Sequence, residues 1–236
     1  MDSAPLLMFP KWANQAAKGV LLAVVGLPLY VGLLLGYGAH PSTLNVGYEP
    51  VQPVPYSHAL HVGKLGLDCR YCHTTVEHAA MAALPPTDVC MNCHHALLPN
   101  SPRLGEVRKS YVEGTPVRWV KVHDLAEYVY FNHSAHVTAG VGCAECHGPV
   151  QQMAAVRTVA PLNMAWCLEC HRSPEAHLRP RDQVTNMEWG SQGDSPIFVE
   201  RKLGQSPGAS AREALGKGLR EKYHVNPNTD CVTCHR

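Results

Sequence analysis

The chain has little of what an ordinary globular core requires. Its 236 residues include only three phenylalanines and 17% charged residues, alongside 19 glycines and 19 prolines. A chain of this length can bury one conventional core, but this composition supplies few side chains to build it. It also lacks an excess of basic residues, since the formal net charge is +1, so the charge gives nucleic-acid binding no support.

No cysteine stands outside a repeated pattern. All ten cysteines fall in five copies of Cys-x-x-Cys-His, called the first to fifth motif below. The copies are Cys69/Cys72/His73, Cys90/Cys93/His94, Cys143/Cys146/His147, Cys167/Cys170/His171 and Cys231/Cys234/His235. Two thiols suit thioether bonds to the two vinyl groups of one haem, and the adjoining histidine is placed to ligate the iron. A zinc site or a redox-active disulfide explains one copy, but not a histidine after every second cysteine.

The sequence therefore predicts five covalently bound c-type haems that supply much of the core. Residues 39–236 leave about 40 residues for each haem. We expect a mainly α and irregular fold, with short helices near the motifs, long loops and little or no sheet. The alternation in residues 117–122 predicts at most one short strand.

One long segment lacks charge altogether. Residues 19–38 carry no charged side chain, and at helical rise these 20 residues span about 30 Å, the thickness of a bilayer core. Lys11 and Lys18 precede the segment and the next lysine or arginine is Lys64, so the positive-inside rule places the amino terminus in the cytoplasm and the haem part outside. A signal peptide would have a shorter apolar region, and Tyr37-Gly38-Ala39 is a poor cleavage site. We expect a retained transmembrane anchor.

Two segments after the anchor share one layout. Each has an aromatic residue, then His-x-x-His, then two motifs; the first begins Tyr56, His58, His61 and the second Phe131, His133, His136. We interpret them as a duplicated dihaem module. The expected organisation is a cytoplasmic segment 1–18, a transmembrane helix 19–38, a Pro-rich linker 39–55, a first dihaem module with connector 56–130, a second dihaem module 131–178, and a partner-binding loop region with the C-terminal haem 179–236.

The His-x-x-His segments are candidates for the sixth iron ligands. Two imidazoles about one helical turn apart can each reach a different haem. The layout resembles the small class III multihaem cytochromes, in which the first histidine ligates the haem that follows and the second a later one. That resemblance implies the pairs His58 with His73, His133 with His147, His61 with His94, and His136 with His171. For the last two pairs, exchange of ligands between the repeats stays open.

The haem on His235 needs another ligand. His123 is preferred because it lies among apolar residues just before the second repeat, and His177 is the alternative. Met153 and Met164 are further candidates, although a methionine near a haem is more often packing. If histidines fill every position, no iron keeps an open face, which argues against catalysis at a haem.

The region 179–225 is rich in Gly, Ser, Pro and charge. Either it is a surface loop with a short helix near residues 211–223, or it wraps a partner subunit. We favour the partner-binding interpretation, because so long a loop is otherwise costly to order.

The chain from about residue 10 to 236 resembles the pentahaem subunit of alternative complex III. The stretches that carry the likeness are His61–His73, Trp119–Leu125, Tyr130–His136 and Trp166–His171. The resemblance implies a single-pass protein of the bacterial inner membrane with its haem domain on the periplasmic side. It also implies a quinol:electron-acceptor oxidoreductase, with an iron–sulfur and molybdopterin-enzyme-like subunit, quinol-binding polytopic membrane subunits and a monohaem cytochrome c as partners.

Within such a complex this chain is expected to relay electrons rather than to bind quinol, because the apolar span carries no ionisable residue except tyrosine. Three alternatives stay open: a self-sufficient multihaem membrane quinol dehydrogenase, a multihaem reductase, and an electron-storage cytochrome without fixed partners.

Overall fold

The structure is a computed structural model that describes residues 10, 12–38, 45–189 and 207–235. It divides into two units, Met1–Leu44 and Asn45–Arg236. The central part of the expected partner-binding region, residues 190–206, lies outside the described residues.

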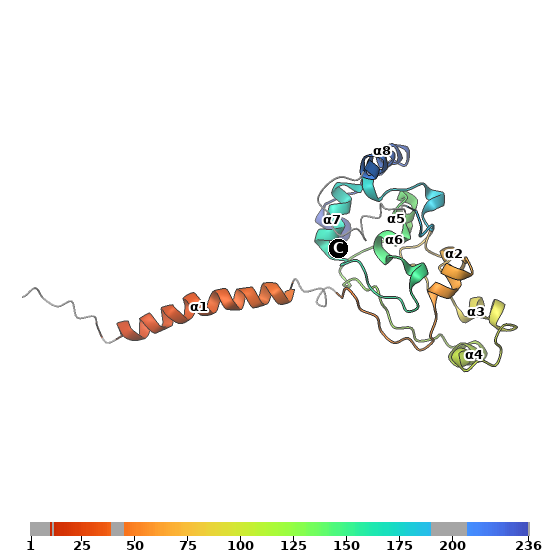
Figure 1. Ribbon diagram of the computed structural model, residues 1–236, viewed down its shortest axis with the longest axis horizontal. Helices are drawn as coiled ribbons and strands as arrows, with labels where there is room; N and C mark the ends of the chain where they lie inside the picture. Colours follow the sequence, from red (N-terminus) through yellow and green to blue (C-terminus); the bar gives the residue numbers. More distant parts are fainter. Residues whose placement is uncertain (1–9, 11, 39–44, 190–206, 236) are drawn as a thin grey trace, which may run out of the picture. The chain divides into compact units, whose positions relative to one another are not determined.

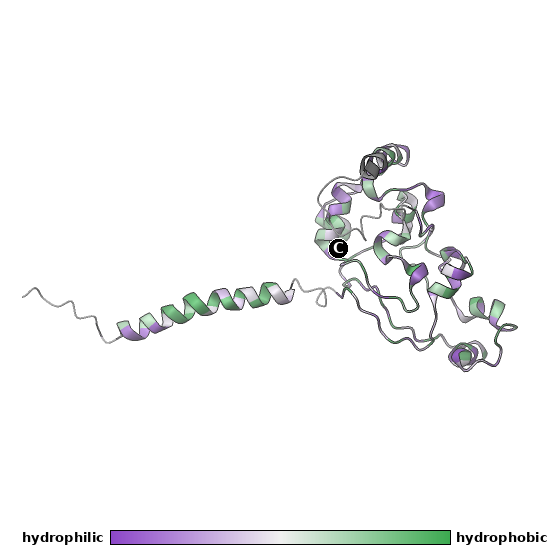
Figure 2. Cartoon of the chain, in the orientation of Figure 1, coloured by the Kyte–Doolittle hydropathy of each residue, from purple (hydrophilic) through white to green (hydrophobic). Residues whose placement is uncertain are grey.

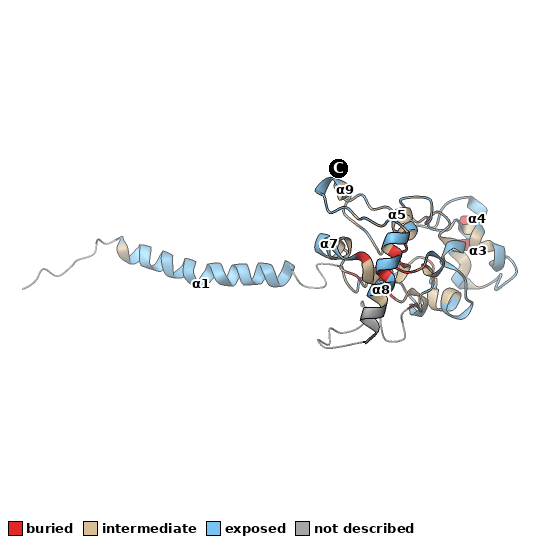
Figure 3. Ribbon diagram, turned by 90° about the horizontal axis from the view of Figure 1, so that it is seen from above, coloured by how far each residue is buried: buried red, intermediate tan, exposed pale blue. Residues whose placement is uncertain are grey.

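The first unit contains one helix, α1 (Ala13–Gly38), in its described part. Its 26 residues give a length of about 39 Å, enough to cross a bilayer core. No residue of α1 is buried, and apolar side chains occupy most of its length (Figures 2 and 3). The helix begins at Ala13, before the charge-free run, and continues through Pro28. By length and composition α1 is a candidate membrane span.

The second unit is built from short helices joined by loops (Figure 1). These are η1 (Ala59–Lys64), α2 (Cys69–Cys72), α3 (Thr87–His94), η2 (Pro102–Leu104), α4 (Gly105–Glu113), α5 (His133–Ala139), α6 (Cys143–His147), η3 (Val150–Gln152), α7 (Met164–Arg172), η4 (Pro174–His177), η5 (Arg181–Gln183), α8 (Pro207–Lys222) and α9 (Cys231–Cys234). Among them η1 is a π-helix and the other η segments are 3-10 helices.

The mainly α and irregular fold is confirmed. The described residues contain no strand, only an isolated bridge between Val141 and Leu178. The short strand expected at residues 117–122 was therefore wrong: the N–H of Trp119 bonds the carbonyl of Val117 within the segment, and Gln52 bonds the backbone at Val120 in place of a β partner. The helix expected near residues 211–223 is confirmed as α8.

Side-chain caps explain where several helices begin. Asp68 accepts a hydrogen bond from the backbone N–H of Arg70 (2.8 Å) at the start of α2. Asn132 and Asn163 act in the same way at the starts of α5 and α7. Because a capped helix start satisfies otherwise unpaired N–H groups, these residues fix the position of the first and fourth motifs and of the second His-x-x-His segment.

The protein buries few hydrophobic side chains of its own. Among the described residues the buried hydrophobic set is Val54, Val76, Val107, Met153, Ala160, Leu178, Val184 and Leu219. So small a core is what the sparse composition predicts, and it agrees with a fold in which cofactors supply the remaining apolar volume.

The two modules interlock through reciprocal backbone contacts. In the first module, Ala59 donates its N–H to the carbonyl of Met153 (2.9 Å) in the second. In return, His133 of the second module donates its N–H to the carbonyl of Ala80 (3.0 Å). The fit is close at η1 and η3, since a Cβ added at Gly63 would lie 2.2 Å from the carbonyl oxygen of Gln151. Glycine at position 63 therefore permits this approach.

Candidate functional site

Each motif lies on, or directly at the end of, a helix. The helices are α2, α3, α6, α7 and α9, and each contains both cysteines of its motif. A helical turn brings residues i, i+3 and i+4 to one side, so the two thiols and the histidine of a motif share a face.

The five motifs form a row whose spatial order differs from their order in the chain. Thiols that interact electrostatically identify the neighbours: Cys90 with Cys72, Cys69 with Cys143, Cys146 with Cys170, and Cys167 with Cys234. The order is therefore second, first, third, fourth, fifth. Figures 1 and 3 show α3, which carries the second motif, and α7, which carries the fourth, on opposite sides of the second unit.

The two repeats place the rings of their aromatic residue and two histidines in nearly the same way. The ring centroid of Tyr56 lies 4.8 Å from that of His58 and 4.4 Å from that of His61. In the second repeat, Phe131 lies 4.8 Å from His133 and 4.4 Å from His136. The interplanar angles also match, at 86° and 87° for the first contact and 21° and 28° for the second. The aromatic residue in each repeat thus packs against both imidazoles and holds them apart.

Three of the four expected histidine pairs lie at the spacing of axial ligands. With metal–nitrogen bonds of about 2 Å, two imidazoles on opposite sides of one iron have ring centroids about 6 Å apart. The observed centroid distances are 6.2 Å for His61 with His94, 6.4 Å for His133 with His147, and 6.1 Å for His136 with His171. For the remaining pair, His58 interacts electrostatically with His73.

Backbone carbonyls orient most of these imidazoles. Seven ring Nδ1 atoms lie 2.7–3.2 Å from a carbonyl oxygen. The pairs are His61 with Ser57, His73 with Ala83, His94 with Leu97, His133 with Ala80, His136 with Asn132, His171 with Asn228, and His235 with Tyr128. A carbonyl only accepts, so Nδ1 carries the proton and the Nε2 lone pair is left for a metal.

Burial keeps the central histidines uncharged. It lowers the pKa of His58 to about 4, with smaller contributions from His73 and His61. It lowers the pKa of His147 to about 3 and also lowers that of His136. Neutral imidazole is the form that binds a metal, so the site is prepared for ligation at neutral pH.

The structure does not bring His123 next to His235. The His123 ring lies 4.4 Å from that of His147, and its buried Nε2 has no hydrogen-bond partner. Among the described residues the ring contact of His235 is with Tyr128, at 5.7 Å. The sixth ligand of the fifth motif therefore stays a prediction.

The alternative candidate, His177, belongs to a buried ion cluster that the sequence did not reveal. Glu145 accepts hydrogen bonds from His177 Nδ1 (3.0 Å), Arg179 Nη2 (2.7 Å) and Arg212 Nη2 (3.3 Å). Arg179 is only 2% exposed. Glu145 occupies a variable position of the third motif, so nothing in the pattern marked it. The cluster ties α8 and η4 to the third motif.

The two methionine candidates differ in their surroundings. Met153 is 2% exposed and lies in the small core, whereas Met164 is 65% exposed at the start of α7.

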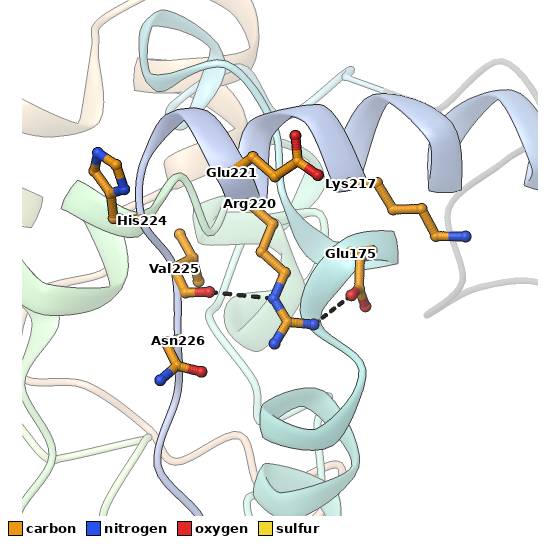
Figure 4. Close-up of a pocket in the computed structure, with 7 residues that line it drawn as sticks. All are labelled: Glu175, Lys217, Arg220, Glu221, His224, Val225 and Asn226. Atoms are coloured by element: carbon orange, nitrogen blue, oxygen red, sulfur yellow. Dashed lines mark hydrogen bonds and ion pairs between the residues drawn. The ribbon is translucent and has the colours of Figure 1, made fainter.

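A surface cavity of 520 Å³ lies beside α8 (Figure 4). Arg220 crosses it, bonded to Glu175 and to the carbonyl of Val225, while the imidazole of His224 points away from this pair. The cavity contains no motif residue. Its contacts therefore fasten α8 to η4 and to the chain that leads to the fifth motif.

Comparison with known families agrees with this geometry. Residues 129–236 match the family described as cytochrome c7 and related cytochrome c. This stretch contains the third, fourth and fifth motifs. By its fold and by this match, the part of the chain at residues 129–236 is similar to cytochrome c7 and related multihaem c-type cytochromes, a class that carries covalently bound haems.

A curated relative covers part of the chain. Over 120 residues the sequence is 35% identical to the menaquinone reductase multiheme cytochrome c subunit of Nitratidesulfovibrio vulgaris, a match to 50% of this chain and 55% of the relative. The chain therefore spans about half the length of this relative. By its name, the relative is the multiheme cytochrome c subunit of a menaquinone reductase.

Proposed function

We propose that this protein is a membrane-anchored pentahaem cytochrome that relays electrons between a quinol-oxidising complex and an acceptor outside the membrane. The observation that carries the proposal is the row of five motifs, in which three histidine pairs have centroid distances of 6.1–6.4 Å. A c-type haem supplies a one-electron carrier that is covalently held by the chain.

The ligand assignments are part of this proposal. Each motif holds one haem through its two cysteines and its histidine. His58, His133, His61 and His136 supply the opposite ligands for His73, His147, His94 and His171. For His235 the sequence predicted His123 or His177, but His123 lies against His147 and His177 bonds Glu145, so we assign no sixth ligand to the fifth motif.

In the four proposed pairs, two histidines of the chain would ligate each iron, which would leave no position for a substrate. The residues around the sites support this role. In the seven rings with a carbonyl contact, the Nδ1–H is held by that carbonyl, so the ring cannot turn its protonated nitrogen toward a metal. The stacked aromatic residues Tyr56 and Phe131 restrict rotation of the paired imidazoles. Such rigid ligation suits electron transfer, which requires little rearrangement, better than a reaction that must open a coordination position.

The proposal also includes the limits of the domains and the location of the protein in the cell. We assign residues 19–38 to the membrane, 56–130 and 131–178 to the two dihaem modules, and 179–236 to a partner-binding region with the fifth haem. The location is the bacterial inner membrane, with the haem part on the periplasmic side. Lys18 at the start of the apolar run supports this orientation.

The partners proposed are those of alternative complex III: an iron–sulfur and molybdopterin-enzyme-like subunit, quinol-binding polytopic subunits and a monohaem cytochrome c. Within such an assembly the end motifs of the row, the second and the fifth, are placed to exchange electrons with neighbours. Cys93 and Cys231 at these ends are exposed, whereas the cysteines between them are at least half-buried.

A second candidate function is electron delivery toward quinone. The match to a menaquinone reductase subunit favours it, because that relative is named for quinone reduction. The same row of sites can carry electrons toward quinone or away from quinol, because the direction of electron flow depends on the redox potentials of the partners.

The test is to tag the native protein, solubilise membranes gently, and assay co-purifying subunits together with haem reduction by quinol. We expect an iron–sulfur subunit and polytopic subunits, and loss of quinol-dependent haem reduction when they are stripped away. Quinone reduction driven through a reduced soluble donor, without quinol oxidation, would favour the second candidate. A lone subunit that still accepted electrons from quinol would contradict both and indicate a self-sufficient quinol dehydrogenase.

A further inference from the structure

The loop after the first motif is closed by one side chain. The hydroxyl of Thr75 donates to the carbonyl of Met81 (2.8 Å) and accepts from the N–H of Ala83 (2.8 Å). The carbonyl of Thr75 also accepts from the N–H of Ala79 (2.8 Å). Thr75 therefore ties residues 79–83 into a compact turn and sets the directions of their carbonyl groups.

Carbonyl groups of this turn hold two histidines that belong to different modules. Ala83 accepts from Nδ1 of His73, the motif histidine of the first module (2.9 Å). Ala80 accepts from both the backbone N–H (3.0 Å) and the ring Nδ1 (2.9 Å) of His133, the candidate opposite ligand in the second module. Ala79 adds a bond from the N–H of Ser134 (3.2 Å).

We propose that Thr75 is a positioning residue that couples the two modules by orienting His73 and His133 through the turn at residues 79–83. The proposal rests on the ligand roles assigned above, because only ligated imidazoles transmit their orientation to an iron. The hydroxyl of Thr75 bonds Met81 and Ala83 rather than either imidazole. It acts through the Ala80 and Ala83 carbonyls, which fix the tautomer and strengthen the donor character of the two rings.

The hydrogen bonds of the other histidines do not depend on Thr75, so the expected effect is confined to two sites. His61 and His136 donate Nδ1–H to Ser57 and Asn132, each four residues earlier in its own segment. His171 donates to Asn228, far from the turn in sequence. None of these contacts passes through Thr75, so its loss affects two sites and leaves the other sites unchanged.

Replacing Thr75 by valine keeps the shape but removes both hydroxyl bonds. Weaker hydrogen bonds from His73 and His133 lower the basicity of these ligands and favour the reduced iron, so two potentials rise. Such an outer partner typically contributes about tenfold or more to metal binding, and the potential moves by the part of this change that falls on the oxidised form alone. For a one-electron couple a tenfold change is about 59 mV.

The experiment is an optical redox titration of the haem-loaded full-length protein, combined with electron paramagnetic resonance of the ferric state. The variants are Thr75→Val, Thr75→Ser, which retains the hydroxyl, and Thr74→Val, which alters the exposed neighbour. Haem content per chain is measured for each. Thr75→Ala removes the hydroxyl without adding a methyl group and replaces Thr75→Val if that variant fails to assemble.

We expect two of the five components to shift upward in Thr75→Val or Thr75→Ala, and none in Thr75→Ser or Thr74→Val. A shift of one component, of none, or of all components equally would overturn the coupling. The electron paramagnetic resonance spectrum of the unaltered protein tests the ligand roles separately. If it lacked the low-spin signals typical of two histidine ligands, the ligand roles themselves would be contradicted, whatever the Thr75 variants show.

Discussion

The interlock between the modules predicts that Gly63→Ala destabilises the folded protein. A Cβ at position 63 would lie 2.2 Å from the carbonyl oxygen of Gln151, well inside van der Waals contact. The obstacle is backbone rather than a flexible side chain, so η1 and η3 must separate. Overpacking of this kind costs about 1–3 kcal/mol. The strain also weakens the nearby bond from Ala59 to Met153.

The matched control is Gly105→Ala. Gly105 begins α4, and an added Cβ meets nothing within 4 Å. Alanine there is expected to stabilise the helix by about 0.5–1 kcal/mol. The assay is urea unfolding of the haem-loaded protein, followed by far-ultraviolet circular dichroism. A Gly63→Ala variant as stable as Gly105→Ala would refute the close contact between the modules.

Three further predictions concern single side chains. Hydrogen bonding by Arg70 lowers the pKa of Asp68 from 3.8 to about 2, so its stabilising effect is full above pH 4 and lost as the pH falls through 2. Asp68→Asn should therefore lower the urea midpoint at pH 7 and flatten its decline between pH 4 and 2. Glu145→Gln leaves the buried Arg179 without its carboxylate partner, and we expect a loss of about 3 kcal/mol in urea unfolding. His61→Ala should open one coordination position, seen as one high-spin haem that binds carbon monoxide after reduction, whereas an unchanged spectrum would contradict its ligand role.

The sequence predicted the local geometry of the motifs well because each motif lies within a short segment. A motif of five residues fixes its own helix turn, and the spacing of His58 and His61 already implied two ligands for different irons. The repeat predicted that the second segment would have the same geometry, and the matching ring distances around Tyr56 and Phe131 agree with it.

The contacts between modules could not be predicted, because they are made by backbone groups. Ala80 and His133 are 53 residues apart, and an alanine carbonyl leaves no signature in the sequence. The spatial order of the motifs could not be predicted for the same reason, because it depends on how the modules pack and not on the order of the motifs in the chain.

The preference for His123 illustrates a further limit of sequence reasoning. Apolar neighbours indicated burial, and burial is what the structure has, since it lowers the pKa of His123. They did not indicate which motif the ring would contact. The strand expected at residues 117–122 failed for a related reason: alternation marks an extended segment, but a strand also needs a partner.

The most direct test of the account is the intact mass of the purified, denatured protein. Thioether-bound haem survives denaturation, so we predict the mass of the mature polypeptide plus five haems. A smaller number of haems, or the mass of the polypeptide alone with or without disulfides, would contradict the assignment of all five motifs and with it the proposed electron relay.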